Sequence, residues 1–183
     1  MKWMIASDLH GSAYYCEKLL AAFDTEQADR LLLLGDLLYH GPRNDLPRDY
    51  DPRAVTALLN GCKERLVCVR GNCDAEVDQM VLNFPILAEY ALIEVEGRVL
   101  FATHGHKYGP DNLPPLCPGD ILLSGHTHVP VCREAEGILL MNPGSASMPK
   151  EGSAAGYMTL ERGVFTWKDF DGAVVREYRL PPR

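Results

Sequence analysis

The sequence predicts an α/β protein in which two β-sheets pack against each other and helices lie outside them. In the first half, short apolar runs alternate with segments of helical periodicity, which is the pattern of βαβ units. In the second half, apolar runs of strand length are separated by turn signals at Glu136-Gly137, Arg162-Gly163 and Asp171-Gly172. The chain has 183 residues and no internal linker, so we expect residues 1–183 to form one domain with a sizeable core.

The first elements are a strand, a helix and a second strand. Residues 3–7 form the first apolar strand, and Ser12 is placed to cap a helix that runs to about Ala22. Residues 31–34 form the next strand. Because a helix connects the two strands, we expect them to be parallel, with a right-handed crossover.

A loop rich in Pro, Arg, Asn and Asp follows at residues 39–52, and its three prolines block regular structure. A loop of this length in a compact domain is usually functional or disordered. Pro52 is placed to open the next helix, from residue 54 to about residue 62 or 65. A third strand at residues 66–69 and a short helix at residues 75–83 complete the α/β half.

The second half is rich in expected strands. Residues 91–96 and 98–103 pair as a hairpin around Gly97, and a Pro-rich loop at residues 109–119 leads to a strand at residues 121–124. The remaining strands are expected at residues 129–133, 138–141, 155–161, 164–168 and 174–180.

Polar side chains follow five of the apolar runs, at the point where each run ends. In chain order these side chains are Asp8 and His10, Asp36, Asn72, His104, and His126 with His128. Open α/β sheets bind ligands at the carboxyl ends of their strands, so we expect these residues to meet at one edge. A single strand that ends in a polar residue would mean little, whereas five such strands indicate a site for more than one metal ion.

The donor types narrow the choice of metal. Carboxylate, amide and imidazole donors without thiolate suit Mn, Fe or Zn better than copper or an iron–sulfur cluster. So many imidazoles disfavour calcium. Asp36 stands alone after its strand, and the two oxygens of one carboxylate can bridge two metal ions. His126 and His128 are two residues apart, which would place both rings on one side of an extended segment.

Composition disfavours several function classes. Lys plus Arg total 18 against 25 Asp plus Glu, and the formal charge of -7 argues against a nuclease with an extended nucleic-acid surface. The six cysteines contain no C-x-x-C pair, which disfavours a zinc finger. No apolar run reaches the roughly 18 residues of a membrane span, and no signal peptide precedes Asp8. We therefore expect a cytoplasmic protein with reduced thiols and no membrane association.

The polar strand ends resemble the five ordered motifs of the calcineurin-like metallophosphoesterases. The matching segments are Asp8-x-His10, Gly35-Asp36, Gly71-Asn72-x-Asp74, His104 and Gly125-His126-x-His128, and Asn142-Pro143-Gly144-Ser145 extends the match. Residues 36–44 and 70–80 are similar to small bacterial phosphodiesterases of this superfamily. The resemblance implies a four-layer fold, with two packed mixed β-sheets flanked by helices, and an enzyme that hydrolyses phosphodiester bonds.

The resemblance also implies a role for each matching residue. One metal ion would be bound by Asp8, His10, Asp36 and His128, and the second by Asp36, Asn72, His104 and His126. Two divalent ions held in this way clamp a phosphoryl group and activate a bridging water or hydroxide as the nucleophile. We expect Mn²⁺, with Fe, Zn or Ni as alternatives, and we count Asn72 among the catalytic residues as well as the ligands.

The general acid of such a reaction is open in this chain. Many members of the superfamily have His where this chain has Cys73, and that His is thought to protonate the leaving oxygen or to stabilise the developing charge. A thiol is a poorer general acid near neutral pH, because its reference pKa is about 8.5. The small bacterial relatives also carry Cys here, so the change does not by itself indicate a dead enzyme. His106 and a metal-bound water are the other candidates, and Cys73 is disfavoured as a covalent nucleophile because the metals make one unnecessary.

Three further residues are assigned by their positions. Asp74 is expected to orient its neighbours rather than to bind metal. Arg43 and Asn44 lie in the loop after Asp36, where they either contact the substrate phosphate or are solvated. Arg suits bidentate binding of phosphate, which is the reason to consider the first role.

The alternative to an enzyme is a non-catalytic scaffold. A retromer subunit with the same fold uses this surface to bind protein partners, so the fold alone does not decide between the two. All seven metal-binding positions are occupied by suitable donors in this chain, which favours the enzyme. We expect a small phosphodiester as its substrate, and the apolar C-terminal third could supply the interface of a homo-oligomer.

Overall fold

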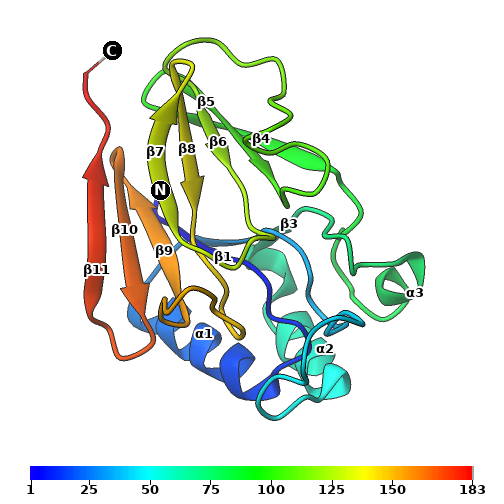
Figure 1. The fold of residues 1–183 in the computed structure, drawn as a ribbon. Coiled ribbons are helices and arrows are strands. Elements are labelled where there is room, and N and C mark those ends of the chain that lie inside the picture. The colour runs from blue at the N-terminus through cyan, green and yellow to red at the C-terminus, as the bar shows by residue number, and fades with distance from the viewer. Residues whose placement is uncertain (183) are drawn as a thin grey trace.

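The structure is a computed structural model that describes residues 1–182 (Figure 1). Its helices are α1 (Ala13–Thr25), α2 (Pro52–Asn60) and α3 (Glu76–Gln79), with a 3₁₀ turn at Lys63–Arg65. Its strands are β1 (Trp3–Ala6), β2 (Arg30–Leu33), β3 (Leu66–Cys68), β4 (Tyr90–Val95), β5 (Arg98–Thr103), β6 (Ile121–Leu123), β7 (Val131–Ala135), β8 (Ile138–Asn142), β9 (Gly156–Glu161), β10 (Val164–Asp169) and β11 (Val174–Arg179). Each helix and strand expected from the sequence is present, although several ends differ.

The strands form two mixed sheets that pack face to face. Six strands make the first sheet, in the order β11-β10-β9-β1-β2-β3, and five make the second, in the order β4-β5-β6-β8-β7. Strands β1, β2 and β3 are parallel to one another, and so are β5, β6 and β8. The predicted architecture of two packed mixed sheets with flanking helices is therefore confirmed.

Local signals set the ends of the longest helix. Ser12 caps α1, because its hydroxyl accepts a hydrogen bond from the backbone N–H of Tyr15 at 3.3 Å. The helix continues past its expected end to Thr25, since Phe23 extends its buried side by almost one further turn. The capping signal thus predicted the start of the helix better than its end.

The other two helices also follow side-chain signals. Pro52 opens α2 as expected, and the carboxylate of Asp51 accepts hydrogen bonds from the first backbone N–H groups of the helix. Helix α3 is shorter than expected and ends at Gln79. The amide of Gln79 donates to the carbonyls of Leu82 and Phe84, both at 2.9 Å, and so holds the following residues in a turn.

Side-chain alternation along the strands divides the core into layers. In β2, Leu31 and Leu33 face the helices α1 and α2, whereas Leu32 faces the second sheet. Leu32 shares its apolar cluster with Leu100 and Ile121 of the second sheet. Both faces of the first sheet are buried around its parallel strands, which explains why these strands read as unbroken apolar runs.

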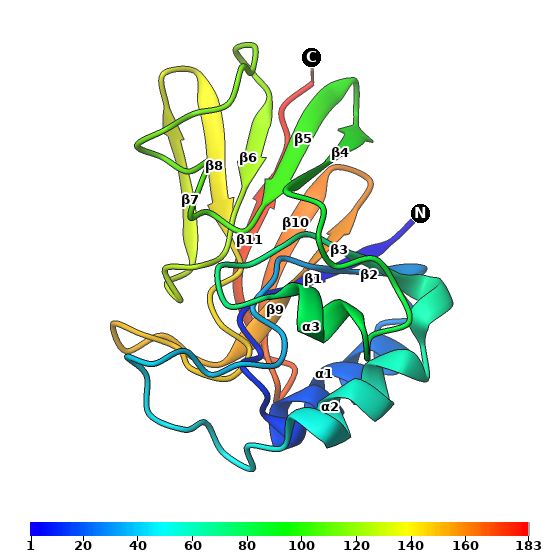
Figure 2. The same cartoon turned by 90° about the vertical axis from the view of Figure 1, so that its right-hand side faces the viewer.

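The two outer sides of the sandwich are covered differently. Helices α1 and α2 lie along the first sheet, as Figure 2 shows. On the second sheet, Phe101 and Leu122 face outward and pack with Tyr108 and Leu116 of the loop that precedes β6. Between residues 1 and 182 no helix covers this face, so a loop with its own apolar side chains forms the outer layer here.

The carboxyl ends of the parallel strands of both sheets meet at one edge of the sandwich. The segment after β1 is joined to the segment after β2, where the N–H of Asp8 donates to the carbonyl of Gly35 at 3.1 Å. It is also joined to the segment after β8, where the N–H of Ala146 donates to the carbonyl of Ser7 at 2.9 Å. The fold therefore gathers the polar strand ends of the sequence into one place.

The cysteines form no disulfides within the part of the chain that the structure describes. All six cysteines carry free thiols, and Cys16, Cys68 and Cys132 are buried. Burial raises the pKa of Cys16 to about 12 and that of Cys68 well above its ordinary value, so these thiols are neutral core side chains.

Within residues 1–182, no helix is long and apolar enough to cross a membrane.

A largely buried carboxylate ties the end of α1 to the first sheet. Glu26 accepts hydrogen bonds from the ammonium groups of Lys168 at 2.6 Å and Lys2 at 2.7 Å, and from the hydroxyl of Tyr157 at 3.0 Å. Burial by itself raises the pKa of Glu26, but these three donors outweigh burial and hold the pKa at about 2. The ionised form of Glu26 therefore stabilises the fold.

We expect Glu26→Gln to remove a pH-dependent part of this stability. The pKa of Glu26 is about 2 in the folded chain against an ordinary 4.5, so its contribution is complete above pH 4.5 and is lost as the pH falls toward 2. Urea unfolding of both proteins across these pH values measures the difference in unfolding free energy. The exposed Glu17→Gln is the matched control, and parallel pH profiles for wild type and Glu26→Gln would contradict this role.

Candidate metal centre

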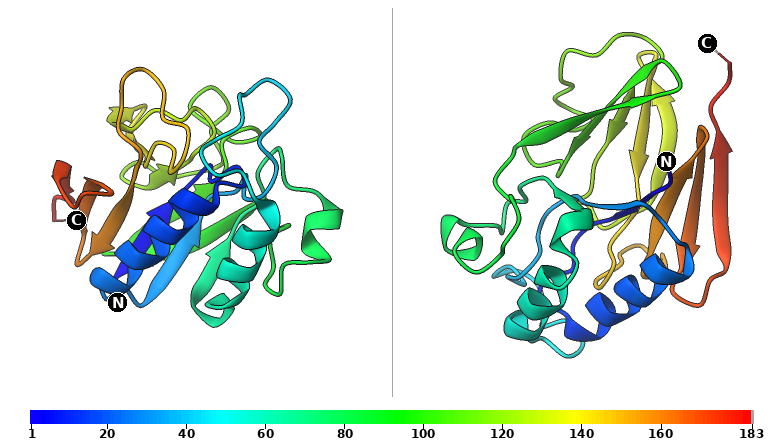
Figure 3. Two further views of the ribbon diagram at one scale, coloured as in Figure 1. Left: turned by 90° about the horizontal axis from the view of Figure 1, so that it is seen from below. Right: turned by 180° about the vertical axis from the view of Figure 1, so that it is seen from behind.

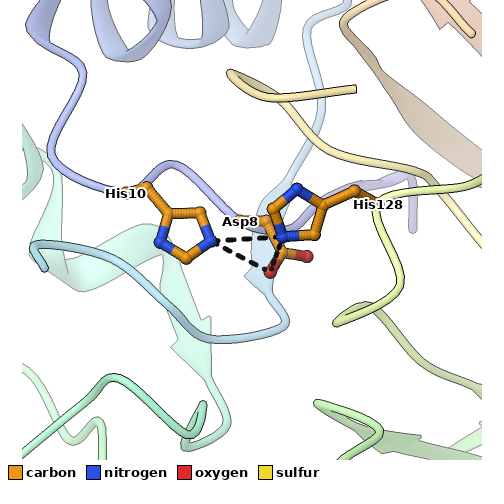
Figure 4. A group of neighbouring side chains, drawn as sticks. All are labelled: Asp8, His10 and His128. Atoms are coloured by element: carbon orange, nitrogen blue, oxygen red, sulfur yellow. Dashed lines mark hydrogen bonds and ion pairs between the residues drawn. The ribbon is translucent and has the colours of Figure 1, made fainter. Parts of the chain in front are cut away.

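Asp8, His10 and His128 form a compact group of possible metal ligands. Asp8 and His10 follow β1, and His128 follows β6, so the group joins the two sheets. Figure 4 shows that both rings point toward the carboxylate of Asp8. The Oδ1 atom of Asp8 lies 3.2 Å from Nε2 of His128 and 3.5 Å from Nε2 of His10, and the two Nε2 atoms are 3.3 Å apart. All three side chains are buried.

Backbone carbonyls fix how the imidazoles are oriented. The Nδ1 atom of His10 lies 2.8 Å from the carbonyl of Tyr39, and Nδ1 of His128 lies 2.7 Å from the carbonyl of Met148. The Nδ1 atom of His104 is held in the same way by the carbonyl of Leu34, at 2.7 Å. A carbonyl oxygen only accepts, so each Nδ1 carries a proton, and each Nε2 faces inward, where the neutral ring offers its lone pair. This is the arrangement that metal-binding histidines adopt.

Asp36 lies between this first group and a second one. Its Oδ2 atom is 3.6 Å from Nε2 of His10 and 3.4 Å from Nε2 of His104. The same Nε2 atom of His104 is 3.0 Å from Oδ1 of Asn72 and 3.2 Å from Nδ1 of His126. The structure therefore brings all seven predicted ligands together, with the carboxylate of Asp36 in the position from which it could bridge.

A cation fits this donor set. The Oδ1 atom of Asp8 is buried and accepts no hydrogen bond, which is costly for a carboxylate unless an ion or a donor faces it. Burial would raise the pKa of Asp8, but the adjoining imidazoles of His10 and His128 hold it far below its ordinary value. The carboxylate is thus charged, and an ionised carboxylate beside imidazole nitrogens is a donor set that divalent metal ions satisfy.

The backbone is strained at most of the candidate ligands. Positive φ angles occur at Asp8 (59°), His10 (48°), Asp36 (56°), His126 (67°) and His128 (63°). Such angles are uncommon for residues other than glycine and persist only where surrounding contacts enforce them. Strain concentrated at five of seven predicted ligands is typical of a functional site.

The same angles overturn one expectation. His126 and His128 have positive φ angles, so the expectation that they lie on an extended segment is wrong, although both rings line the same cavity. The two rings belong to different groups of candidate ligands. His128 joins Asp8, whereas His126 joins His104 and donates its backbone N–H to Oδ2 of Asp8 at 3.0 Å.

Asp74 holds the segments after β2 and β3 together. Its carboxylate accepts backbone N–H groups from Asp36 at 2.8 Å, Leu37 at 2.9 Å and Gly71 at 2.7 Å. Burial raises the pKa of Asp74, and these three donors act in the opposite direction. Both oxygens are occupied by the backbone, so Asp74 positions Asp36 and does not line the cavity.

A cavity of about 420 Å³ opens over the candidate ligands. Its lining residues are His10, Asp36, Gly41, Pro42, Arg43, Asn44, Asn72, Cys73, His126, His128 and Lys150. The predicted substrate-binding residues Arg43 and Asn44 therefore lie on its wall. His106 does not line it; its exposed ring lies 5.4 Å from the ring of His104 between centroids.

Cys73 lines the cavity beside Asp36. Its backbone N–H donates to Oδ1 of Asp36 at 2.8 Å, and its sulfur lies within 4.8 Å of ligand atoms of His10 and Asp36. Burial, and then the negative charge of Asp36, raise the pKa of Cys73 to about 12. In these surroundings the thiol is a weak acid.

Several residues that support the site were given no role in the sequence analysis. The hydroxyls of Ser145 and Ser147 both donate to the carbonyl of Asp8 at 2.9 Å, and the amide of Asn142 donates to the carbonyl of Gly125 at 2.7 Å. Asn142 and Ser145 belong to a motif that the sequence does signal. Lys150 lines the cavity from the same loop, and nothing in the sequence distinguishes it from a solvated lysine.

Comparison with known proteins identifies the family. The family model described as the calcineurin-like phosphoesterase superfamily domain matches residues 1–163. The chain belongs to this superfamily. It is 48% identical to phosphodiesterase YfcE of Escherichia coli over 166 residues, which cover 91% of this chain and 90% of that protein. The probable metallophosphoesterase YsnB of Bacillus subtilis is 27% identical over 185 residues, covering 94% and 92%.

One solved structure agrees with this assignment, and a second shares the fold. The structure of E. coli YfcE matches with a TM-score of 0.95 and 44% identity, and the match covers 99% of this chain and 100% of that chain. The expected likeness to small bacterial phosphodiesterases is thereby confirmed. Vps29 of Chaetomium thermophilum matches with a TM-score of 0.62 and 17% identity, covering 99% and 100%, which shows a shared fold.

We expect Gly71→Ala to displace Asp36. A methyl group at position 71 would collide with the carboxylate and the backbone N–H of Asp36, because nothing larger than hydrogen fits there. Overpacking of this kind costs about 1–3 kcal/mol, so the variant should unfold at lower urea concentration and retain less Mn²⁺ after gel filtration. Gly61→Ala at the end of α2 is the matched control, and a Gly71→Ala protein with wild-type stability and metal content would contradict the argument.

Proposed function

We propose that this protein is a metal-dependent phosphodiesterase with two metal ions in its site. The observation that carries the proposal is the convergence of two buried carboxylates, one amide oxygen and four inward-facing imidazoles at the meeting edge of two sheets. Phosphodiesterase YfcE, the relative at 48% identity, supports diesters as the substrate class. The expected cytoplasmic location and self-association stay predictions.

Two groups of residues would hold the ions. Asp8, His10, Asp36 and His128 suit one ion, and Asp36, Asn72, His104 and His126 suit the other. The donor set favours Mn²⁺, with Fe, Zn or Ni as alternatives. When bound, such ions stabilise negative charge on the phosphoryl oxygens and lower the pKa of the attacking water.

The chain itself orients the substrate and manages its protons. Arg43 and Asn44 line the cavity, and we assign them contacts with the phosphate because a guanidinium can donate two parallel hydrogen bonds to it. Asp74 acts through Asp36, whose position it fixes. Cys73 and His106 are the side chains that could give a proton to the leaving oxygen. Cys73 lines the cavity, whereas His106 stands outside its wall.

The function is tested by hydrolysis of bis(p-nitrophenyl) phosphate. We expect turnover by protein loaded with Mn²⁺, loss of turnover on treatment with a chelator, and recovery when Mn²⁺ is restored. A protein that binds two metal ions yet turns over neither monoesters nor diesters would exclude the enzyme and favour a scaffold.

Asp36→Asn is the matched variant for this assay. The substitution keeps the shape of the side chain but removes its charge, so we expect loss of most activity and of metal at both positions. Elemental analysis of the purified variant measures the metal content. Wild-type metal content and rate would show that Asp36 does not bridge.

We expect Cys73→Ala to retain activity on the same activated diester within about tenfold, which is less than a general acid contributes. Nitrophenolate is a good leaving group that departs without a proton, so a proton donor adds little to the rate on this substrate. Steady-state kinetics of wild type and variant provide the measurement. A loss of about a hundredfold or more would assign direct chemistry to the thiol.

A further inference from the structure

We propose that the substrate carries a second negative charge beside its scissile phosphate, and that Lys150 receives this charge. The inference rests on the proposed function and specifies the substrate class of the same site. That class is a phosphodiester in which one of the two esterified alcohols bears a carboxylate or a further phosphate.

The position of Lys150 relative to Arg43 is the first observation. Both residues line the cavity, but Arg43 belongs to the loop after β2 and Lys150 to the loop after β8. Figure 3 shows, in the view from below, that these two loops project from the same edge of the molecule as separate segments. The cavity is therefore lined by two cations from two different loops, and a substrate in the cavity can meet both.

Lys150 is also a lysine without an acidic partner. The chain has six lysines, and four of them, Lys2, Lys18, Lys107 and Lys168, lie within ion-pair distance of a carboxylate. Within the part of the chain that the structure describes, Lys63 and Lys150 have no such pair, although Glu151 is the next residue after Lys150. Of these two lysines, only Lys150 lines the cavity.

The backbone of Lys150 is anchored to the candidate metal centre. Its N–H donates to the carbonyl of His128 at 3.1 Å, and its carbonyl accepts the N–H and the hydroxyl of Ser153, at 3.0 and 2.6 Å. The base of the side chain is thus fixed relative to His128, whereas the ammonium group is exposed. A fixed base with a flexible stem suits a charged group at the mouth of the cavity.

Charge balance indicates what the ammonium group meets. A phosphodiester bears one negative charge at phosphorus, and two divalent ions with Arg43 supply more than enough positive charge for it. The protein as a whole carries a formal charge of -7, which repels a ligand with additional negative charge. An unpaired ammonium at the cavity mouth offsets that repulsion locally, and it serves a substrate with a second anionic group.

The test compares two matched esters on metal-loaded protein. One is p-nitrophenyl carboxypentyl phosphate, which has the second charge, and the other is p-nitrophenyl hydroxyhexyl phosphate, which lacks it. We expect wild type to prefer the carboxylate ester in kcat/KM, and Lys150→Gln to lower that preference about fivefold, the value of one exposed charge contact. Lys63→Gln, which also removes one unpaired lysine, should keep the wild-type preference.

The outcomes separate this inference from the proposed function. Failure to hydrolyse either ester would contradict the function itself. Hydrolysis of both esters with no preference would overturn the inference about the second charge and leave the proposed function standing. A preference that Lys150→Gln leaves intact would have the same meaning. Equal losses on both esters in Lys150→Gln would place Lys150 at the scissile phosphate and would also overturn it.

A binding measurement decides the inference even without turnover. Calorimetry with phosphonopropionate, which has a carboxylate, and ethylphosphonate, which has none, gives two affinities for each protein. We expect the carboxylate to improve the affinity for wild type and Lys63→Gln by about fivefold, and to give no improvement for Lys150→Gln. Equal affinities of wild type for the two phosphonates would refute the role of Lys150.

Discussion

The burial of two carboxylates at the junction of the sheets is the constraint on which the candidate site depends. Asp8 and Asp36 are almost fully withdrawn from water, and an ionised carboxylate in such a place is costly unless positive charge or donors surround it. The imidazoles that face them are fixed in orientation, because their Nδ1 atoms are committed to backbone carbonyls and their Nε2 atoms face the carboxylates. Divalent cations are the chemical complement of carboxylates and imidazole nitrogens held in this way.

Residues that touch neither metal nor substrate keep this arrangement in place. The left-handed backbone at five candidate ligands is unfavourable locally, and hydrogen bonds from neighbouring loops offset it. Asp74 joins the segments after β2 and β3, and Ser145 and Ser147 join the segment after β8 to Asp8. The loops around the site thus depend on one another, so a substitution in one of them is felt in the others.

The sequence revealed the fold and the set of candidate ligands because both have periodic or local signals. Apolar runs located the strands, and the polar residues at their ends located the site, as for Asp36 after β2. The two histidines after β6 show the limit of this reasoning, since alternation assumes an extended backbone and the chain turns left-handed at both positions. Lys150 shows another limit. Its relation to Arg43 comes from tertiary structure, which brings together two loops more than a hundred residues apart.

The division of the ligands between two sheets has a mechanical consequence. Asp8 and Asp36 extend from the six-stranded sheet, and His104 and His126 extend from the five-stranded one, so a cation that binds members of both sets bonds the two layers to each other. Sliding or rotation of one layer against the other would then stretch coordination bonds as well as disturb apolar packing. Binding of metal ions would therefore make the whole sandwich more resistant to shear, in addition to ordering the loops around the site.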